Sequence, residues 1–365
     1  MKSQVILLGM LVVGSTFFAC KKVTEGNLVQ YDPTPYSIEY VNNTLPVPTF
    51  PSDNPLTKAK VQLGRMLFYE TELSLDGSVS CASCHLQENA FADPRQFSLG
   101  VGGAEGGRQA MAIFNMAWHE NEFFWDGRAH LLRDQALLPI QDPLEMNETL
   151  DAVVAKLMKS QIYKNQFRRA FGEFEINPTK ISLALEAFMM SIISEDSKYD
   201  RYLAGTATLT DSEERGRQLF YTEYNEFFPD ISGADCAHCH AGNNFENDLY
   251  MNNGLDTDAE FTDFGREDAT NNPADRAKFK VTSLRNVAVT APYMHDGRFQ
   301  TLEEVVDHYN EHVQASSTVD PALLGTTSTG LMLDDQEKED LINFLKTLTD
   351  ETLLTDPAYS NPFEE

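Results

Sequence analysis

Hydrophobic residues recur along most of this chain with the period of an amphipathic helix. The clearest example is the stretch TKISLALEAFMMSIIS, in which Ile181, Leu185 and Phe188 share one helix face. Pro178 stands just before this stretch, and proline is typical of the first turn of a helix. Strand-like alternation of apolar and polar residues is nearly absent. The pattern therefore predicts an all-α protein.

Turn-forming residues interrupt the helical pattern in several places. The stretch VNNTLPVPTFPSDNP is broken by prolines and predicts a linker without regular structure. Glycine, asparagine and aspartate also gather into clusters that predict loops, at residues 98–107, 241–257 and 263–275.

A further helix is predicted in TLEEVVDHYNEH, near the end of the chain. Thr301 and Glu304 have the spacing of a capping box, so we expect a helix to begin just after the threonine. The same phase places His312 at the edge of the apolar stripe and His308 further round, towards solvent. Of the three potential metal ligands here, only the tyrosine is predicted to point into the domain. The stripe itself consists of Leu302, Val305, Val306 and Tyr309.

The first residues predict export. A basic start, an apolar run from Val5 to Ala19 and then Cys20 are typical of a secretory signal peptide of residues 1–19. The stretch TFFAC resembles a bacterial lipoprotein cleavage box, although Phe17 replaces the usual leucine. We expect Cys20 to carry a lipid, so that the membrane is met only through this anchor, with residues 20–54 as anchor and linker. Simple secretion with an ordinary cysteine is the alternative.

Composition adds a strong negative charge. The 365 residues include 28 Lys and Arg against 56 Asp and Glu, a formal net charge of −28. This charge argues against nucleic-acid binding. It is typical either of a chain that meets a cationic or neutral partner, or of a surface that is acidic for solvation alone. The length suggests two domains, at about 150 residues for each.

The cysteines indicate a prosthetic group. Five is an odd number for an exported chain, and apart from Cys20 they form the motifs CASCH and CAHCH. In c-type haem attachment, the two thiols of C-x-x-C-H bond the vinyl groups and the histidine ligates the iron. One copy could also be a zinc half-site or a redox dithiol, but two copies in an exported chain favour haem. The predicted attachment residues and proximal ligands are Cys81, Cys84, Cys236, Cys239, His85 and His240.

The surroundings of the two haem motifs repeat. GRMLFY begins at Gly64 and GRQLFY at Gly216, and each haem motif is followed by an Asp-Gly-Arg triplet, at Asp126 and at Asp296. The offsets grow slowly, from 152 to 155 to 170 residues, as expected for a duplicated domain with loop insertions. We therefore predict two tandem cytochrome c-like haem domains and a C-terminal tail, with the boundaries 55–205, 206–350 and 351–365.

Several motifs together carry a resemblance to a known family. CASCH, FFWDGRA, DQALLPIQDPLEM, CAHCH and TAPYMHDGRFQTLEEVVDHY, in this order, resemble the bacterial di-haem cytochrome c peroxidases and their relative MauG, the di-haem enzyme of methylamine utilisation. The resemblance covers residues 55–350. It implies that hydrogen peroxide reacts at the N-terminal haem and that the C-terminal haem receives electrons from a donor.

By the same resemblance, three residues of the first domain serve the reaction. Glu145 in DPLEM matches the catalytic glutamate, whose carboxylate can move a proton between the two oxygens of peroxide. Gln135 matches a glutamine of the peroxide pocket. Trp125, which stands where the second copy has His295, matches the tryptophan between the haems. It relays electrons or, as the alternative, only packs in the core.

The first domain departs from the family at one point. Typical di-haem peroxidases have a histidine about 16 residues after the first haem motif, and it blocks that iron until the second haem is reduced. The corresponding stretch here, FSLGVGGAEGGRQ, contains no histidine, and His119 and His130 lie in other segments with ordinary roles expected. We therefore predict a five-coordinate first haem that is active without reductive priming.

The sixth ligand of the second haem has several candidates. Tyr309 lies 14 residues after His295, where typical di-haem peroxidases have a ligating methionine and MauG has a tyrosine. A phenolate ligand would stabilise oxidised iron. We favour Tyr309 over Met294, and both over the nearby histidines His295, His308 and His312. A tyrosine that only packs in the core is the alternative.

The resemblance also implies a calcium ion between the domains. By position, Gln109, Thr290 and Pro292 match its protein ligands, through one side-chain amide and two backbone carbonyls. Glutamine stands at the first of these positions, where asparagine is usual.

Together, these observations predict a periplasmic di-haem cytochrome c peroxidase. It would reduce hydrogen peroxide to water with electrons from a small donor such as a cytochrome c or a cupredoxin. The alternatives are a MauG-like oxidase that acts on a protein or organic substrate, and a non-catalytic di-haem electron carrier. A homodimer is left open.

Overall fold

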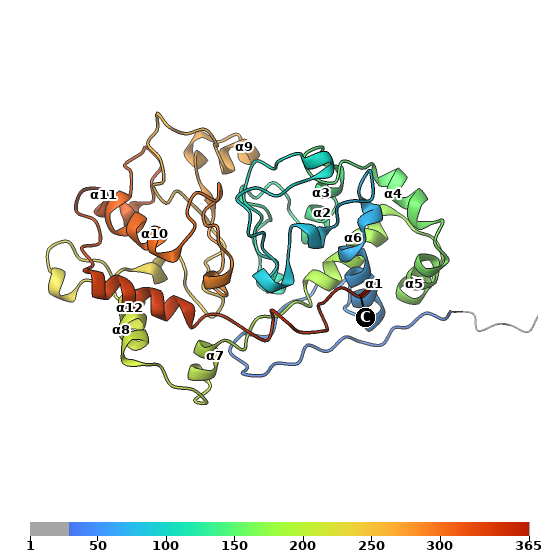
Figure 1. The fold of residues 1–365 in the computed structure, drawn as a ribbon, viewed down its shortest axis with the longest axis horizontal. Helices are drawn as coiled ribbons and strands as arrows, with labels where there is room; N and C mark the ends of the chain where they lie inside the picture. Colours follow the sequence, from blue (N-terminus) through green and yellow to red (C-terminus); the bar gives the residue numbers. More distant parts are fainter. Residues whose placement is uncertain (1–28, 365) are drawn as a thin grey trace, which may run out of the picture.

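The computed structural model describes residues 29–364, so the predicted signal peptide and the predicted lipid-bearing Cys20 lie outside the described residues. The described chain is mostly helical with little sheet, which confirms the helical character expected from the sequence. It forms two lobes side by side, with α1 to α6 in one and α8 to α12 in the other (Figure 1). No helix of residues 29–364 is both long enough and apolar enough to span a membrane.

The first lobe is built around the crossing of α1 (Lys58–Tyr69) and α6 (Pro178–Met189). The helices can approach closely because a Cβ on Gly64 would lie only 1.9 Å from the carbonyl oxygen of Ala184. The rings of Phe68 and Phe188 then meet edge to face, 5.3 Å apart, in the core. The remaining helices of this lobe are α2 (Leu132–Gln135), α3 (Leu138–Gln141), α4 (Leu150–Leu157) and α5 (Gln161–Phe171).

The second lobe repeats this crossing with α8 (Asp211–Tyr221) and α12 (Asp335–Lys346). A Cβ on Gly216 would lie 1.9 Å from the carbonyl oxygen of Asp340, and the rings of Phe220 and Phe344 are 5.3 Å apart. The repeated hexapeptide therefore makes the same close helix contact in both lobes. The other helices are α7 (Lys198–Leu203), α9 (Arg266–Thr270), α10 (Leu302–Asp307) and α11 (Thr326–Thr329).

Two of the three predicted loops contain regular structure, so that prediction was partly wrong. In the second, β1 (Tyr250–Met251) pairs antiparallel with β2 (Phe279–Lys280). In the third, α9 is held by an ion pair of 2.6 Å between Glu267 and Arg276. Both elements are too short to produce a recognisable hydrophobic period. The first cluster contains only a short 3₁₀ turn, at Val101–Gly103.

The two predicted helices are confirmed. α6 begins at Pro178, and α10 begins after Thr301, whose side chain forms the expected capping box with Glu304. The prediction for His308 was wrong, because its side chain is 3% exposed and its Nε2 lies 3.1 Å from the carbonyl oxygen of Asn253. Residues His308–His312 form a π-helical turn, which has more residues per turn than an α-helix, so the α-helical phase no longer applies there.

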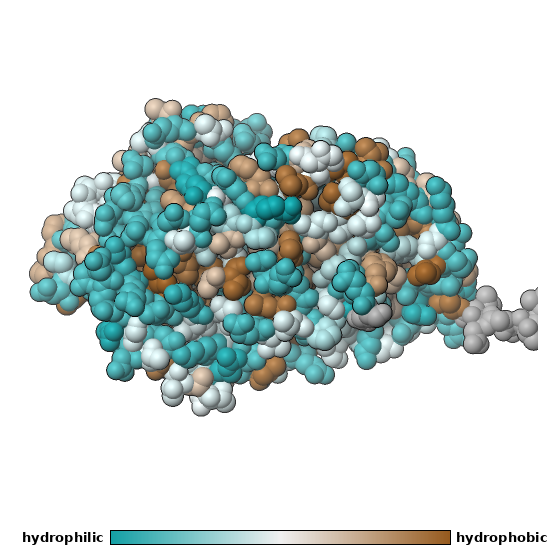
Figure 2. Space-filling model, viewed as in Figure 1, coloured by the Kyte–Doolittle hydropathy of each residue, from teal (hydrophilic) through white to brown (hydrophobic). Residues whose placement is uncertain are grey.

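Both ends of the described chain cross between the lobes. After α12 the chain returns to the first lobe (red in Figure 1), where the hydroxyl of Tyr69 donates to the carbonyl oxygen of Tyr359 at 2.8 Å. The side-chain amide of Gln87 donates to the carbonyl oxygen of Leu353 at 2.9 Å. The extended N-terminal segment runs below the first lobe in the same view and reaches the second, where the side-chain amide of Asn243 donates to the carbonyl oxygen of Thr44. Hydrophilic residues cover most of the face seen in Figure 2, with hydrophobic residues in separate small patches.

Candidate active site

Each lobe encloses a cavity beside one CxxCH motif. The cavity of the first lobe has a volume of about 480 Å³ and is lined by Cys84 and His85. The cavity of the second has a volume of about 280 Å³ and is lined by Cys236, Cys239 and His240. Within residues 29–364, all four motif cysteines are free thiols and none forms a disulfide.

The two motifs fold in the same way. In each, a 3₁₀ turn begins at the first cysteine, and the N–H of the histidine donates to the carbonyl oxygen of that cysteine, at 3.0 Å for His85 and 2.9 Å for His240. One turn therefore holds the two cysteines and the histidine of each motif together, beside its cavity. Burial raises the pKa of the Cys81 and Cys236 thiols to about 12, as expected for sulfurs that face an apolar space.

The imidazoles are oriented as iron ligands require. Nδ1 of His85 lies 2.9 Å from the carbonyl oxygen of Phe91, and Nδ1 of His240 lies 3.0 Å from that of Thr282. Because a carbonyl only accepts, Nδ1 carries the proton and Nε2 is left as the metal-binding nitrogen. Burial lowers the pKa of both rings, that of His240 to about 4, which keeps the ligand form neutral. The residues of both cavities thus fit a covalently attached haem.

Glu145 and Gln135 line the first cavity together with His85. Gln135 comes from α2, and Glu145 lies in the turn after α3, where its N–H donates to the carbonyl oxygen of Asp142 at 3.0 Å. Burial raises the pKa of Glu145 from 4.5 to about 7, with a smaller contribution from Asp142, while Arg128 acts in the opposite direction. A carboxyl group with such a pKa can both accept and donate a proton near neutral pH.

The histidine-free stretch after the first haem motif also borders this cavity, through Ser98 and residues 106–109. Neither of the two other histidines considered for this iron is arranged like His85. His119 does line the cavity, but its two ring nitrogens face Asp248 and Glu246, and His130 is exposed on the surface. The five-coordinate first haem stays a prediction.

Trp125 lies in the wall that the two cavities share, since it lines both. Its indole N–H donates to the carbonyl oxygen of Gln109 at 2.8 Å, and its own carbonyl oxygen accepts the N–H of Lys280 at 2.8 Å. The indole is thereby held by the first lobe, and the backbone of the same residue is held by the second. This is the position expected of an electron relay between the cavities.

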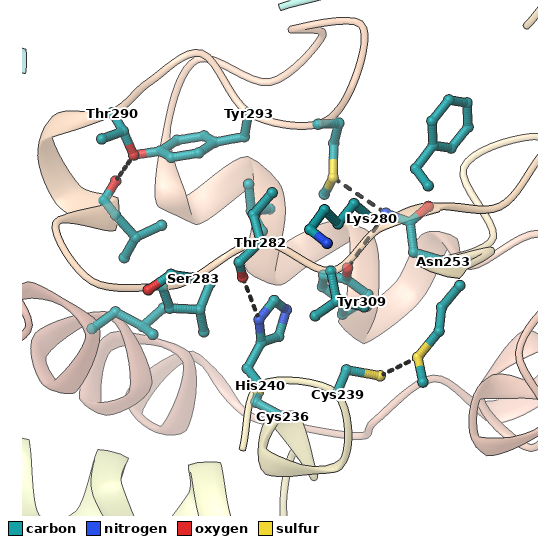
Figure 3. A pocket seen from close by; sticks show the side chains of 18 of the residues that line it. Cys236, Cys239, His240, Asn253, Lys280, Thr282, Ser283, Thr290, Tyr293 and Tyr309 are labelled. Carbon is teal, nitrogen blue, oxygen red and sulfur yellow. Dashed lines mark hydrogen bonds between the residues drawn. The ribbon is translucent and has the colours of Figure 1, made fainter. Parts of the chain in front are cut away.

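The two candidates for the sixth ligand converge in the second cavity. The side-chain amide of Asn253 lies 3.2 Å from the sulfur of Met294 and 3.4 Å from the hydroxyl of Tyr309 (Figure 3). Both side chains line the cavity that also contains His240. Burial raises the pKa of Tyr309 to about 12, while the contact with Asn253 lowers it. Of the histidines considered, His295 is stacked on the ring of Phe279, at 3.6 Å between centroids.

The residues predicted to bind calcium are brought to one cavity. Gln109, Thr290 and Pro292 all line the cavity of the second lobe. The amide nitrogen of Gln109 donates to the carbonyl oxygen of Asp93 at 3.1 Å, which leaves the amide oxygen as the potential ligand. The calcium site stays a prediction.

Sequence reasoning missed several residues that shape the site. Asn253, which contacts both candidate ligands, lies in a predicted loop of polar residues and carries no pattern that would single it out. Lys280 and Asp248 form a buried ion pair beside Trp125, although they are 32 positions apart in the sequence. Only the three-dimensional fold reveals these contacts.

Comparisons with known proteins agree with this arrangement. The family model described as di-haem cytochrome c peroxidase matches residues 58–208. The chain is 32% identical to the methylamine utilization protein MauG of Methylophilus methylotrophus, over 82% of this chain and 84% of that protein. It is 30% identical to the cytochrome c551 peroxidase of Nitrosomonas europaea, over 83% and 84%. A crystal structure of a MauG-like protein associated with microbial copper homeostasis superposes with a TM-score of 0.79 at 37% identity, over 88% and 98% of the two chains.

Proposed function

The chain belongs to the family of di-haem cytochrome c peroxidases and MauG-like enzymes, and from this premise we propose a specific activity. The protein is a cytochrome c peroxidase that reduces hydrogen peroxide to water with two electrons from a small redox protein. The proposed haem domains, with the boundaries 55–205 and 206–350, correspond to the two lobes except for α7, which packs with the second lobe. Peroxide reacts in the first lobe, and electrons enter through the second.

The observation that carries this proposal is that Glu145 lines the same cavity as His85 and has a pKa raised to about 7. A haem held by Cys81 and Cys84 would supply a redox-active iron ligated by His85. The carboxylate of Glu145 takes the proton from one oxygen of peroxide and returns it to the other, so that the O–O bond breaks with water as the leaving group. The amide of Gln135 holds the peroxide by hydrogen bonds while this proton moves.

Two electrons and two further protons complete the reduction of each peroxide to two molecules of water. The electrons reach the first cavity from the second, and Trp125 lies in the wall between them. The indole offers a route through a residue that both lobes hold in place. The predicted sixth ligand of the second haem is Tyr309, with Met294 as the second choice.

An exposed apolar loop lies beside the second cavity and favours a protein donor. Phe227, Phe228 and Ile231 are 78%, 63% and 68% exposed, and the loop packs against the segment before α11 through Tyr224. Both segments continue directly into residues that line the cavity, among them Ala234 and Leu323.

The rim of this loop is acidic, with Glu223, Glu226 and Asp230 all exposed. The whole chain has a formal net charge of −28. An apolar centre with an acidic rim is complementary to a small redox protein that surrounds its own cofactor edge with lysines. A basic cytochrome c fits this description.

The test is turnover of the purified protein with both haems attached. Peroxide is added with and without reduced cytochrome c, and oxidation of the donor is followed by its absorbance. We expect rapid turnover that consumes two donor molecules for each peroxide. If peroxide causes no oxidation of any donor, the protein is an electron carrier and the proposal is wrong.

A MauG-like oxidase is the second candidate, favoured by the tyrosine in the second cavity. The hydroxyl of Tyr309 and the sulfur of Met294 both contact the side-chain amide of Asn253. A phenolate ligand would stabilise the oxidised form of the second haem, which would then be a poor electron acceptor. The same experiment separates the two functions. A long-lived oxidised species with little donor turnover would indicate the oxidase, which acts on a protein or organic substrate.

We propose that the protein works in the periplasm, tethered to a membrane through a lipid on Cys20. The support is the signal-like start of the chain and the cysteine directly after it. Growth with labelled palmitate should label the protein, and the change Cys20→Ser should abolish the label while leaving peroxidase activity intact. We also propose that a calcium ion binds between the domains through Gln109, Thr290 and Pro292.

A further inference from the structure

Four ionisable side chains gather between the two cavities, and the reaction described above does not use them. His119 comes from the first lobe, whereas Glu246, Asp248 and Lys280 come from the second. His119 and Lys280 each line both cavities. The side chains are 7%, 6%, 15% and 1% exposed in this order, so solvent screens their charges poorly. We call these four residues the interlobe cluster.

Lys280 and Asp248 fix the backbone of residues 120–125, which ends at Trp125. The N–H of Lys280 donates to the carbonyl oxygen of Trp125 at 2.8 Å, and its ammonium group is paired with the carboxylate of Asp248. The same carboxylate accepts the N–H groups of Glu120 at 2.7 Å and Asn121 at 2.6 Å. The ion pair lies within the second lobe, whereas the three backbone N–H bonds cross from one lobe to the other, so together they fix the tryptophan relative to the second cavity.

Among residues 29–364, Glu246 accepts no hydrogen bond from a cationic side chain. Its Oε1 accepts from the amide of Asn244 at 2.6 Å, but its Oε2 is buried with no hydrogen-bond partner. Nε2 of His119 lies 3.6 Å from the same Oε2, while Nδ1 of that ring lies 3.3 Å from Asp248. A buried carboxylate oxygen without a partner is rare in folded proteins, and this one lies next to a histidine that lines both cavities.

We propose that the interlobe cluster is a positioning device for electron transfer, which holds Trp125 between the cavities and favours the loss of an electron from its indole. Because Lys280 neutralises Asp248, the carboxylate of Glu246 is the excess charge of the cluster. An indole that loses an electron becomes positively charged, and a negative charge nearby in a poorly screened region stabilises it. No bond forms or breaks: the electron passes to the first cavity and is replaced from the second.

This inference rests on the proposed electron route through Trp125. The experiment mixes the protein, with both haems attached and the second one reduced, with peroxide in a stopped-flow instrument. The absorbance of the second haem gives the rate at which it loses its electron. Glu246→Gln keeps the shape of the side chain and removes its charge, so we expect this rate to fall about tenfold. Freeze-quenched samples should also show less tryptophan radical by electron paramagnetic resonance.

Glu195 provides a matched control. It is 4% exposed and its Oε2 also lacks a partner, but it lines neither cavity. Glu195→Gln should therefore leave the rate unchanged. A second variant, Lys280→Met, keeps the backbone N–H but removes the ion pair with Asp248, and it should change the lineshape of the tryptophan radical.

Two outcomes would contradict the inference, and one of them would also contradict the proposed electron route through Trp125. If Trp125→Phe transfers electrons at the rate of the unmodified protein, the proposed route through the indole is wrong, and the role of the cluster with it. If Trp125→Phe is slow but Glu246→Gln stays within about twofold of the unmodified protein, only the role of the cluster is wrong.

Discussion

The backbone of Gly100 lies directly against the backbone of Glu145. A Cβ on Gly100 would come within 2.1 Å of the carbonyl oxygen of Leu144 and within 2.5 Å of that of Glu145. The next residue, Val101, donates its N–H to the carbonyl oxygen of Glu145 at 2.8 Å. Residues 97–109, which contain no histidine, therefore have a structural function, because Gly100 and Val101 support the turn that carries the proposed catalytic carboxylate.

The change Gly100→Ala should lower peroxide turnover without unfolding the protein. The added methyl group must push the turn that carries Glu145 away, and displacement of an acid–base group commonly costs about 100-fold in rate. Turnover with a small chemical donor measures the loss. Gly107→Ala in the same stretch is the control, since a Cβ there meets nothing within 4 Å. Equal activity of the two variants would contradict this role for Gly100.

The pH dependence of peroxide reduction should follow the carboxyl group of Glu145. Its pKa is raised to about 7, and it must be ionised to take the first proton from peroxide. The second-order rate constant for peroxide should therefore fall as the pH falls below about 7. Glu145→Gln should be slower by about 100-fold or more and lose this pH dependence. The exposed Glu105, changed to Gln, should retain both the rate and its profile.

The same group links stability to pH in a predictable direction. Because the pKa of Glu145 is higher in the folded state than its usual 4.5, the folded protein binds this proton more tightly than the unfolded chain. Its contribution to stability is therefore lost as the pH rises from about 4.5 to above 7. Urea titrations should show Glu145→Gln to be more stable than the unmodified protein at pH 8, by about 1–3 kcal/mol, and equal to it at pH 4.

Much of this arrangement could be predicted from the sequence because it depends on local patterns. The CxxCH motifs close in a single turn, and the hexapeptides with Gly64 and Gly216 make the same helix contact in each lobe. The capping box at Thr301 also depends only on residues three positions apart. Such local patterns can be recognised from the sequence alone.

The parts that could not be predicted depend on contacts between distant segments or on a change of helix type. His308 was expected to face solvent, but a π-helical turn carries it into the protein, where it meets Asn253. Lys280 reaches Trp125 only because a two-residue strand ends beside the first lobe. An orphaned carboxylate such as that of Glu246 is visible only once its neighbours are known.

The identity of the sixth ligand should be decided by single substitutions in the second cavity. We expect Tyr309→Phe to change the absorption and electron paramagnetic resonance spectra of the second haem, because it removes the only oxygen that a phenol can offer to iron. Met294→Leu should leave those spectra unchanged. The opposite result would make the sulfur the ligand, and the shared contact of both side chains with Asn253 would then position Met294 instead.

The proposed donor surface should affect the affinity for a protein donor and not the chemistry. Phe227→Ser combined with Ile231→Ser removes two exposed apolar side chains beside the second cavity, which should raise the KM for cytochrome c about tenfold with little change in kcat. Turnover with a small chemical donor, which needs no docking surface, should stay the same. Ile162 on α5 in the first lobe is 63% exposed, so Ile162→Ser is a matched control and should leave both donors unaffected. Because the rim is acidic, the KM of the unmodified protein should also rise with salt. If the double variant and the control have the same KM for cytochrome c, the donor binds elsewhere on the protein.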